Sequence, residues 1–495
     1  MRVLFTSPEI FPLVKTGGLG DVAGALPPAL HRAGAEMRLL MPAYPGVETL
    51  TEAKPVANLG DPFGRGDAVV LEGRMPQSDL TLWLLDCPAL FHRDGGPYQD
   101  GAGQDWPDND LRFALLGWTA ARLSRGDSPL PWQPHVLHAH DWQTGLAAAY
   151  LRAWGGARPG VVFTIHNMAY QGLFAADLVP RLNLPWSLHT MDGFEFWGRM
   201  SYLKAGLAFS DKLTTVSPTY AKEIQTPAYG FGMEGLLSYR AKDLSGILNG
   251  ADYGVWDPAG DSHLACRYGA DDVVRGKAAN KAALQAELGL PAAPSVPLCV
   301  VISRLNDQKG MDLLLAIMPA LLEQGAQLAL LGTGEHAIEA AMQALAKARP
   351  DQVAVRIGYS EGMAHRLQAG GDILLMPSRF EPCGLTQIYA LRYGTLPVVS
   401  FTGGLADTVV DASYATLLHG KATGFVFQQC TPSAFQWCVE RAIGMYRRPE
   451  QWRDIQANAM RQAFSWDQAA GRYLDLYRSL LSIGEGGKAE GGGQP

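Results

Sequence analysis

The chain has 495 residues, a formal net charge of −7 and 47% hydrophobic residues. Its length is too great for one ordinary core and predicts two domains. The negative charge, without any clustered run of Lys and Arg, argues against a nucleic-acid partner, and no apolar run approaches the roughly 18 residues of a membrane span. The six cysteines are scattered and the N-terminus does not resemble a signal peptide, so we expect reduced thiols and a cytoplasmic protein.

The first half of the chain predicts alternating strands and helices. Residues 2–7 are typical of a buried strand, residues 22–32 of a helix that contains Pro27 and Pro28, and residues 37–41 of a second strand. This spacing predicts a βαβ unit and therefore a parallel sheet with a right-handed crossover. Further helices are expected at 110–123 and 144–154, and further strands at 81–86, 136–142, 161–165 and 212–216.

Two short motifs in this half have competing interpretations. Residues 18–23 satisfy the pattern G-x-G-x-x-[GA], but about ten residues separate them from the strand and the nearest suitable acid, Glu36, precedes the next strand. We therefore favour a Gly-rich loop over phosphates rather than a dinucleotide fingerprint. Asp108 and Asp110 form a D-x-D of the kind that metal-dependent sugar transferases use, but N-capping of the following helix is the favoured role.

Histidines mark the ends of two predicted strands. His138 and His140 share one strand face by period two, and because no third ligand is evident we favour hydrogen-bonded histidines over a metal pair. His166 and Asn167 directly follow strand 161–165. Polar residues just beyond the carboxyl end of a parallel strand are candidates for a functional site.

The small residues from Ser245 to Asp252 are the expected boundary between domains 1–245 and 246–463. From Leu298 the alternation restarts, with strands at 298–303, 327–332, 353–358, 372–377 and 396–400 and helices at 311–323, 335–347, 361–369 and 385–393. The stretch 452–481 is expected to be largely helical, and the Gly-rich residues 482–495 to form a flexible tail. The predicted fold class is α/β, with two Rossmann-like, doubly wound domains facing each other across a deep cleft.

The stretch from Ser378 to Gly394 combines a strand end, a carboxylate, a turn and a helix start. Glu381 follows strand 372–377, Pro382 and Gly384 break the chain, and a helix begins near Leu385. This loop is expected to hold the sugar and phosphates of an activated sugar donor, because free backbone N–H groups and a helix N-terminus favour anions there. Glu381 would accept hydrogen bonds from sugar hydroxyls, and N-capping of the next helix is its alternative role.

Two cations follow the first strand of the second half. Arg304 and Lys309 precede a helix that begins near Met311, and together with Glu381 they predict a cradle for a diphosphate rather than two solvated surface charges. Tyr359 follows strand 353–358 and could stack on a planar base, although an ordinary amphipathic tyrosine is an open alternative. Lys15, before two glycines, could reach a phosphate or a sugar.

Six motifs in order carry a resemblance to a known family. They are Lys15-Thr-Gly-Gly-Leu19, His138-Ala-His-Asp-Trp142, His166-Asn-Met-Ala-Tyr-Gln-Gly172, Ser303-Arg-Leu-Asn-Asp-Gln-Lys-Gly310, Glu381-Pro-Cys-Gly-Leu-Thr386 and Thr402-Gly-Gly-Leu-Ala-Asp407. Together they resemble the bacterial glycogen synthases, which are similar to the plant starch synthases. The likeness covers residues 1 to about 481, and the combination of the first and fifth motifs is highly specific.

The resemblance implies a retaining glycosyltransferase of the GT-B type that uses no metal and no cofactor. Its partners would be ADP-glucose and an α-1,4-glucan such as glycogen, which it would extend at the non-reducing end, with neither nucleic acid nor membrane involved. The family's last helix returns to the first domain, which would place residues 464–481 there. Because no nucleophilic carboxylate can be named, attack on the same face as the departing ADP is the hypothesis for retention.

The resemblance also assigns roles to individual residues. Arg304, Lys309, Glu381 and His166 would be catalytic. The other residues would bind substrate: Lys15, Thr16, Gly17 and Gly18 the donor, Asp21, Asn249 and Tyr359 the nucleotide, Cys383, Gly384, Leu385 and Thr386 the glucose and phosphates, and Glu9 and Asp141 the transfer site.

One departure and three alternatives remain. Many members of the wider superfamily carry a second Glu eight residues after the first, where this chain has Tyr389, so a second carboxylate on the ribose is not supported. A UDP-glucose-dependent synthase is the nearest alternative, because the base contact rests on Tyr359 and its neighbours. A silent glucan-binding protein would be expected to lack some of Lys15, Arg304, Lys309 and Glu381, and all four are present. A pyridoxal-phosphate phosphorylase would need a dedicated site that the sequence does not show.

Overall fold

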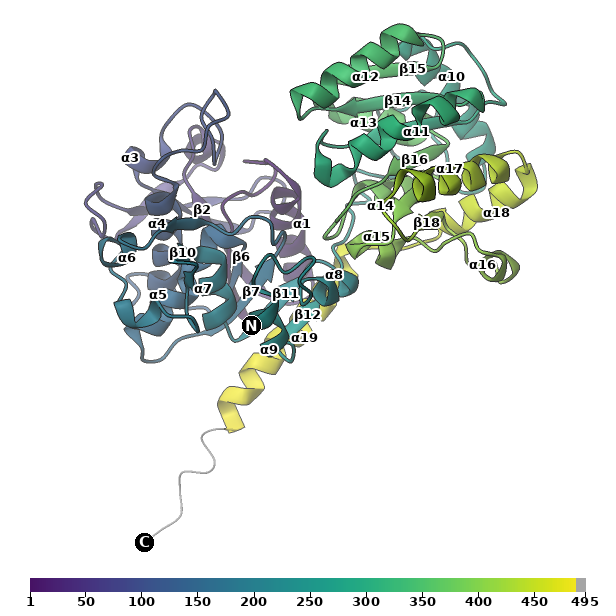
Figure 1. Cartoon of the computed structure of the whole chain (residues 1–495). Helices are drawn as coiled ribbons and strands as arrows, with labels where there is room; N and C mark the ends of the chain where they lie inside the picture. The colour runs from purple at the N-terminus through teal and green to yellow at the C-terminus, as the bar shows by residue number, and fades with distance from the viewer. Residues whose placement is uncertain (487–495) are drawn as a thin grey trace. The chain divides into compact units, whose positions relative to one another are not determined.

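A computed structural model describes residues 1–486, with side chains described to residue 481. The chain forms two compact units (Figure 1). Unit 1 comprises residues 1–250 together with the chain from Trp466 onward, and unit 2 comprises residues 251–465. The last helix, α19 (Trp466–Gly486), extends into the range expected for the Gly-rich tail, and the rest of that tail, 487–495, lies outside the described residues.

Unit 1 is built on a nine-stranded sheet with the order β12-β11-β7-β6-β1-β2-β5-β4-β3. Neighbouring strands from β12 to β5 are parallel, whereas β4 and β3 add an antiparallel edge. The strands are β1 (Arg2–Thr6), β2 (Glu36–Pro42), β3 (Lys54–Asn58), β4 (Val69–Arg74), β5 (Thr81–Asp86), β6 (Val136–His140), β7 (Gly160–Ile165), β11 (Lys212–Thr215) and β12 (Leu244–Gly246).

The central strands of unit 1 are apolar and buried, as parallel strands covered on both faces must be. Helices α1 (Gly18–Arg32) and α19 pack on each other, and α5 (Leu146–Trp154) packs between α4 (Asn109–Leu123) and α7 (Tyr202–Phe209). Shorter helices are α2 (Val47–Leu50), α3 (Pro88–Phe91), α6 (Leu178–Arg181), α8 (Pro218–Glu223) and α9 (Glu234–Tyr239). A small antiparallel sheet contains β8 (Leu173–Ala175), β10 (Arg199–Ser201) and β9 (Glu195–Phe196).

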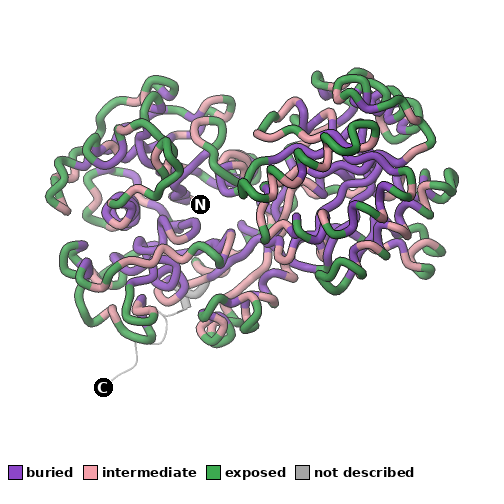
Figure 2. Tube along the Cα trace, turned by 45° about the horizontal axis from the view of Figure 1, so that its top comes forward, coloured by how far each residue is buried: buried purple, intermediate pink, exposed green. Residues whose placement is uncertain are grey.

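Unit 2 contains a wholly parallel six-stranded sheet with the order β15-β14-β13-β16-β17-β18. Its strands are β13 (Leu298–Ile302), β14 (Gln327–Gly332), β15 (Val353–Ile357), β16 (Ile373–Met376), β17 (Leu396–Ser400) and β18 (Phe425–Phe427). Figure 2 shows these strands as a buried layer inside more exposed helices. The helices are α10 (Val273–Leu288), α11 (Met311–Glu323), α12 (His336–Ala348), α13 (Glu361–Gly370), α14 (Thr386–Arg392), α15 (Gly403–Thr408), α16 (Tyr414–Leu418), α17 (Pro432–Tyr446) and α18 (Pro449–Met460).

The two faces of this sheet have separate cores. Cys299 and Val301 of β13 pack in a cluster with α11, α17 and α18, whereas Leu298 and Val300 pack in another with α10 and α13. Successive side chains of a strand point to opposite faces, so alternate residues enter different cores. Helices therefore cover both faces, and the predicted α/β class with two Rossmann-like, parallel-sheet domains is confirmed.

Several predicted elements differ from the structure. Helix α1 begins at Gly18, not Val22, and continues through Pro27 and Pro28 without a break. The expected helix at 452–481 is two helices, α18 and α19. The hairpin of β3 and β4, the small sheet, β18 and α17 were not predicted.

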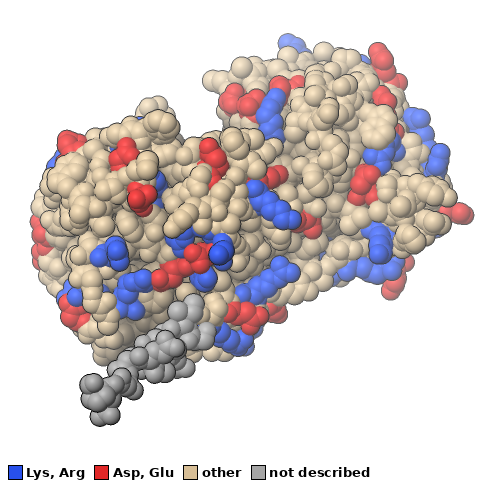
Figure 3. All heavy atoms as spheres, turned by 60° about the horizontal axis from the view of Figure 1, so that its bottom comes forward, with Lys and Arg blue, Asp and Glu red and all other residues tan. Residues whose placement is uncertain are grey.

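The surface carries charges of both signs, and Figure 3 shows Lys and Arg interspersed with Asp and Glu over the face that it presents. Among the helices of residues 1–486, none combines the length and the apolar character that crossing a bilayer demands.

Candidate active site

The sheet of unit 1 has a topological switch point at β1, which lies between β6 and β2. Open α/β sheets bind ligands at the carboxyl ends of strands beside such a point. Glu9 lies just beyond β1, Asp141 directly follows β6, and His166 directly follows β7. All three side chains are buried. The structure thus brings together three predicted site residues that lie far apart in the sequence.

Glu9 anchors the loop that leads into helix α1. One carboxylate oxygen accepts a short hydrogen bond from the backbone N–H of Thr16. Burial raises the pKa of Glu9, although hydrogen bonds from the loop partly oppose that shift. A buried carboxylate therefore holds the loop in place, while the loop's own residues remain exposed. These are Lys15, Thr16, Gly17 and Gly18.

Packing within unit 1 does not require glycine at either of the two glycine positions of this loop. A Cβ added at Gly17 or Gly18 would meet no atom within 4 Å, and Gly17 has an extended backbone with φ of −155°. Their small size leaves open space above the start of a 15-residue helix, where N–H groups favour an anion. Beside them, Lys15 Nζ lies 2.7 Å from a carboxylate oxygen of Asp21, so these two predicted ligands form an ion pair.

Asp141 has a strained backbone at the end of β6. Its φ of 56° and ψ of −178° fall in a region that only glycine adopts without cost. The strain is offset in part by a hydrogen bond of 2.7 Å from the backbone N–H of His166 to Asp141 Oδ1. Burial raises the pKa of Asp141 to about 7, while hydrogen bonds from the backbone of His166 and Asn167 oppose the shift.

The histidines form a buried network. His138 bonds Tyr477 of α19 at 2.7 Å and Thr164 at 2.6 Å, which confirms that it is a hydrogen-bonded histidine. Nδ1 of His140 lies 3.0 Å from Nε2 of His166, and Nε2 of His140 is buried without a partner. Burial lowers the pKa of His138 and of His166 to about 3, so both rings are neutral near pH 7.

Asn249 lies in the loop after β12 and is also buried. Its side-chain oxygen has no hydrogen-bond partner, which is costly for a buried polar atom unless a ligand supplies one.

Unit 2 has its own switch point between β13 and β16. Lys309 follows β13 and Glu381 follows β16, and the two side chains form a short, largely buried ion pair. Ser378 also donates to Glu381 at 3.1 Å. The N-capping role considered for Glu381 is wrong, because Leu385 occupies that position without a side-chain cap. One cation and one carboxylate thus meet at the switch point of unit 2.

Glycines hold this pair in place. Gly310 has φ of +66°, and a Cβ there would fall on the carbonyl oxygen of Pro377 at the end of β16. Gly404 approaches Cys383 equally closely and donates its N–H to the carbonyl oxygen of Glu381 at 3.1 Å. The Thr402-Gly-Gly stretch, part of the last of the six motifs that carry the resemblance, therefore supports the loop that carries Glu381.

The other predicted residues of unit 2 lie along the same sheet edge. Arg304 is exposed after β13, with one guanidinium nitrogen 3.4 Å from the side-chain oxygen of Gln308. Tyr359 is 72% exposed after β15. Cys383 is buried, and Gly384, with φ of +70°, leads through Leu385 into Thr386 at the start of α14.

The position where the superfamily carries a second carboxylate is part of a stack of rings. Tyr389 lies parallel to Trp256 with ring centroids 4.1 Å apart, and Trp256 stacks on His365 at 3.8 Å. An aromatic platform therefore takes the place of the missing acid.

The structure bears on both competing motifs of unit 1. Asp108 occupies the N-cap position of α4, but its carboxylate binds Arg93 at 2.9 Å and caps no backbone group, so the predicted capping is wrong for Asp108. Asp110, in the first turn, does accept a backbone N–H on Oδ1, that of Leu111, at 2.7 Å. Glu36 accepts a hydrogen bond from Trp132, which engages the carboxylate that a dinucleotide fingerprint would need. Among residues 1–486, no group of three or more His, Cys, Asp or Glu is arranged to hold a metal ion.

Sequence comparison supports a two-part transferase. Residues 2–239 match the family described as Starch synthase catalytic domain, and residues 290–459 match Glycosyl transferases group 1. The chain is 61% identical to a glycogen synthase of Paramagnetospirillum magneticum over 99% of both chains, and 50% identical to one of Leptothrix cholodnii over 97% of this chain and all of that one. Its structure is similar to the catalytic domain of starch synthase IV from Arabidopsis thaliana bound to ADP and acarbose, with a TM-score of 0.86, 31% identity and coverage of 97% and 99%.

Two Rossmann-like domains, each with polar groups at its switch point, define a glycosyltransferase of the GT-B class. The chain belongs to the glycogen synthase family. It is a glycosyltransferase that acts in glycogen synthesis.

Proposed function

We propose that this enzyme transfers glucose from ADP-glucose to the non-reducing end of an α-1,4-glucan with retention of configuration. The observation that supports this most directly is the Lys309–Glu381 ion pair at the switch point of unit 2. A sugar nucleotide presents hydroxyls and a diphosphate side by side, and a carboxylate next to a cation matches both. Arg304, exposed at the same sheet edge, would supply a second cation to the diphosphate.

Negative charge develops on ADP as the glycosidic bond breaks. Arg304, Lys309 and the backbone N–H groups near Thr386 would stabilise that charge, which removes the need for a metal ion in this proposal. Glu381 would orient the glucose through its hydroxyls, and Tyr359 would carry the base. The loop from Lys15 to Gly18 would contact the donor, and Asp21 and Asn249 the nucleotide side.

The residues of unit 1 bear on how retention is achieved. Glu9 and Asp141 both accept backbone hydrogen bonds, and Asp141 has a raised pKa. Neither is therefore a good nucleophile for the covalent intermediate that retention usually requires. We infer attack on the same face from which ADP departs. The backbone of His166, held by Asp141, would place a carbonyl oxygen against the positive charge on the anomeric carbon.

The test is incorporation of labelled glucose into glycogen from ADP-glucose or UDP-glucose, with a chelator such as EDTA present. Incorporation from ADP-glucose, unaffected by the chelator, is expected. Incorporation from UDP-glucose alone would overturn the donor assignment, and loss of activity that Mg²⁺ restores would overturn the metal-free mechanism. A cytoplasmic location also remains a proposal, which cell fractionation would test.

A further inference from the structure

Gln387 lies beside the loop 383–386 but is not among the residues assigned to the donor. It is the second residue of α14, and its side chain is completely buried. Its amide nitrogen Nε2 donates to the carbonyl oxygens of Cys383 and Gly384, both at 3.0 Å, and lies 3.2 Å from the hydroxyl oxygen of Thr408. One side chain therefore joins two successive carbonyl groups of the loop to helix α15.

The amide of Gln387 has only one consistent orientation. Both carbonyl oxygens accept hydrogen bonds and cannot donate them, so the NH₂ end of the amide faces them. The other end, Oε1, is buried without a hydrogen-bond partner among the described residues. A buried polar oxygen without a partner is unfavourable, so packing alone would favour an apolar side chain at this position. What the glutamine contributes is therefore its donation to the loop.

The same hydrogen bonds set the direction of two backbone N–H groups. In a planar trans peptide the C=O and the N–H point in opposite directions. Because the carbonyls of Cys383 and Gly384 point at Gln387, the N–H groups of Gly384 and Leu385 point away from it. Gly384 has φ of +70°, whereas Leu385 is right-handed, with φ of −114° and ψ of −29°. Neighbouring residues of opposite backbone hand turn successive N–H groups to one side, and such concavities bind anions.

The other two carbonyl groups of the loop are engaged as well. That of Leu385 accepts the backbone N–H of Tyr389 at 2.9 Å, and that of Thr386 accepts an N–H of the Gln368 side chain at 3.0 Å. Gln368 is buried, and its Oε1 likewise has no partner within the described part of the chain. All four carbonyl groups from 383 to 386 therefore have donors within unit 2, and the N–H side of the loop is left for a ligand.

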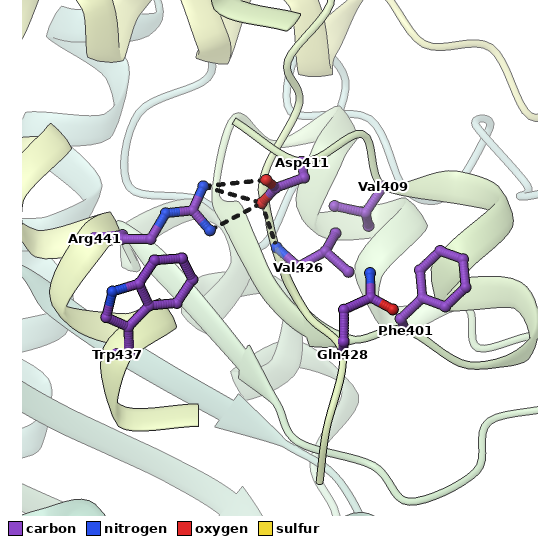
Figure 4. Close-up of a pocket in the computed structure, with 7 residues that line it drawn as sticks. All are labelled: Phe401, Val409, Asp411, Val426, Gln428, Trp437 and Arg441. Atoms are coloured by element: carbon purple, nitrogen blue, oxygen red, sulfur yellow. Dashed lines mark hydrogen bonds and ion pairs between the residues drawn. The ribbon is translucent and has the colours of Figure 1, made fainter. Parts of the chain in front are cut away.

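The anchor of Gln387 on α15 is itself fixed. Thr408 ends α15, and its hydroxyl donates to a carbonyl oxygen of its own helix at 2.6 Å, so a lone pair remains for Gln387. Figure 4 shows the segment that follows, in which Val409 lines a pocket beside the ion pair of Asp411 and Arg441. The contacts of that pair are 3.1–3.2 Å long, so the chain is held directly after α15.

We propose that Gln387 is a positioning residue for glucosyl transfer, which holds the N–H groups of Gly384 and Leu385 toward the diphosphate of the donor. The inference rests on the proposed function, because that function supplies the diphosphate. Donors that already point at the leaving group need no reorganisation when negative charge develops there, so they stabilise that charge more than mobile donors would. The side chain of Gln387 itself acts only through the two peptide groups.

Replacing Gln387→Met keeps the length of the side chain and removes its N–H donors. We expect kcat to fall by about ten- to 100-fold, because the loop loses its fixed direction. The affinity for inorganic pyrophosphate, measured by titration calorimetry, should fall by about five- to tenfold, whereas the KM for glycogen should stay unchanged. This split separates positioning from a general loss of structure, which would not spare the acceptor.

The matched control is Gln456→Met. Gln456 is a buried glutamine of α18, and its Nε2 donates to the carbonyl oxygen of Gly394 at 2.8 Å, beyond the far end of α14. The control therefore loses the same kind of hydrogen bond without affecting the loop 383–386, and it should change neither kcat nor pyrophosphate binding. Wild-type kcat and pyrophosphate affinity in Gln387→Met would overturn the proposal, as would equal losses in the control.

A second measurement needs no variant. In the wild type, hydrogen exchange of the Gly384 and Leu385 amides should slow when pyrophosphate binds, and absent binding or unchanged exchange would contradict their assigned direction. Pyrophosphate contains neither sugar nor base, so its binding does not depend on which donor the enzyme uses. Pyrophosphate binding that depends on Gln387, in an enzyme that fails to use ADP-glucose, would therefore contradict the proposed function and leave the role of Gln387 standing.

Discussion

His140 approaches His166 with Nδ1 and Nε2 only 3.0 Å apart, while the other ring nitrogen of His140 is buried without a partner. A buried N–H without an acceptor is rarer than a buried lone pair without a donor. We therefore assign the proton of His140 to Nδ1, from which it is donated to His166. His166 then carries its own proton on Nδ1, so His140 is a positioning residue for it.

The first prediction concerns this pair. Replacing His140→Leu should lower kcat on the order of 10- to 100-fold with little change in the KM for the donor, because His166 loses its orienting partner. His140→Asn, which can keep a donor near the Nδ1 position, should retain most of the activity. Nitrogen chemical shifts of His166 should show the proton on Nδ1. A wild-type kcat for His140→Leu, or a proton on Nε2 of His166, would contradict the assignment.

The second prediction tests the cations of unit 2. Arg304→Ala and Lys309→Met should each lower kcat by about 10²- to 10³-fold, because they would stabilise the charge of departing ADP. Lys309→Met should also weaken ADP binding measured by calorimetry. Lys347→Met, at an exposed lysine of unit 2, is the control and should change neither quantity. Near-normal turnover in the Arg304 and Lys309 variants would remove both residues from the mechanism.

The third prediction separates two costs of replacing glycine. Gly310 and Gly325 both have positive φ, but only at Gly310 would a Cβ collide with another backbone atom. Gly325→Ala should lower the free energy of unfolding by roughly 1 kcal/mol, and Gly310→Ala by more, with loss of ADP binding as the Lys309 loop is displaced. Chemical denaturation and calorimetry measure both effects. Equal costs at the two positions would show that the close approach to β16 does not matter.

Much of the fold was predictable because its signals are local. The apolar runs of β13, β14, β16 and β17 alternate with amphipathic helices, and this alternation alone indicates a parallel sheet. The hairpin of β3 and β4 was missed because β3 is largely exposed and contains a proline, so it lacks the apolar run of a buried strand. Helix α17 did have a signal, since Thr431 caps it and Pro432 occupies its first turn.

The candidate site was predictable only in part. Arg304, Lys309 and Glu381 follow apolar strands, so their place at a strand end could be inferred, but the pairing of Lys309 with Glu381 joins residues 72 positions apart. His140 was set aside as a structural histidine, although its contact with His166 links it to the candidate site. The left-handed backbone of Asp141 could not be foreseen, because no glycine marks it.

The fourth prediction follows from the pKa of Asp141, which burial raises from 3.8 to about 7. Between these values the folded chain binds more protons at this carboxyl than the unfolded chain, so its contribution to stability falls as pH rises from about 4 to about 7. Asp141→Asn lacks this contribution. From pH 5 to 8 the variant should therefore gain on the order of 1 kcal/mol or more relative to the wild type, measured by urea denaturation. A difference independent of pH would contradict the raised pKa.

The fifth prediction concerns Tyr477 of α19, whose hydroxyl bonds His138 at 2.7 Å inside unit 1. Tyr477→Phe leaves the buried ring of His138 without that partner and should lower the free energy of unfolding by about 1–3 kcal/mol. Tyr414→Phe, at an exposed tyrosine of unit 2, is the control and should cost nothing measurable. Equal stability of both variants would show that the Tyr477 hydroxyl contributes little.

Helix α19 closes unit 1 with residues that the ribosome makes only after all of unit 2. Unit 2 is continuous in the chain and has every one of its strands available as soon as residue 465 has emerged. The first part of unit 1, by contrast, is made without α19. His138 and its neighbours therefore lack their contact with this helix while more than two hundred further codons are translated. Translation therefore imposes an order in which the later-encoded unit is complete before the earlier one, the reverse of the usual N-terminal-first sequence.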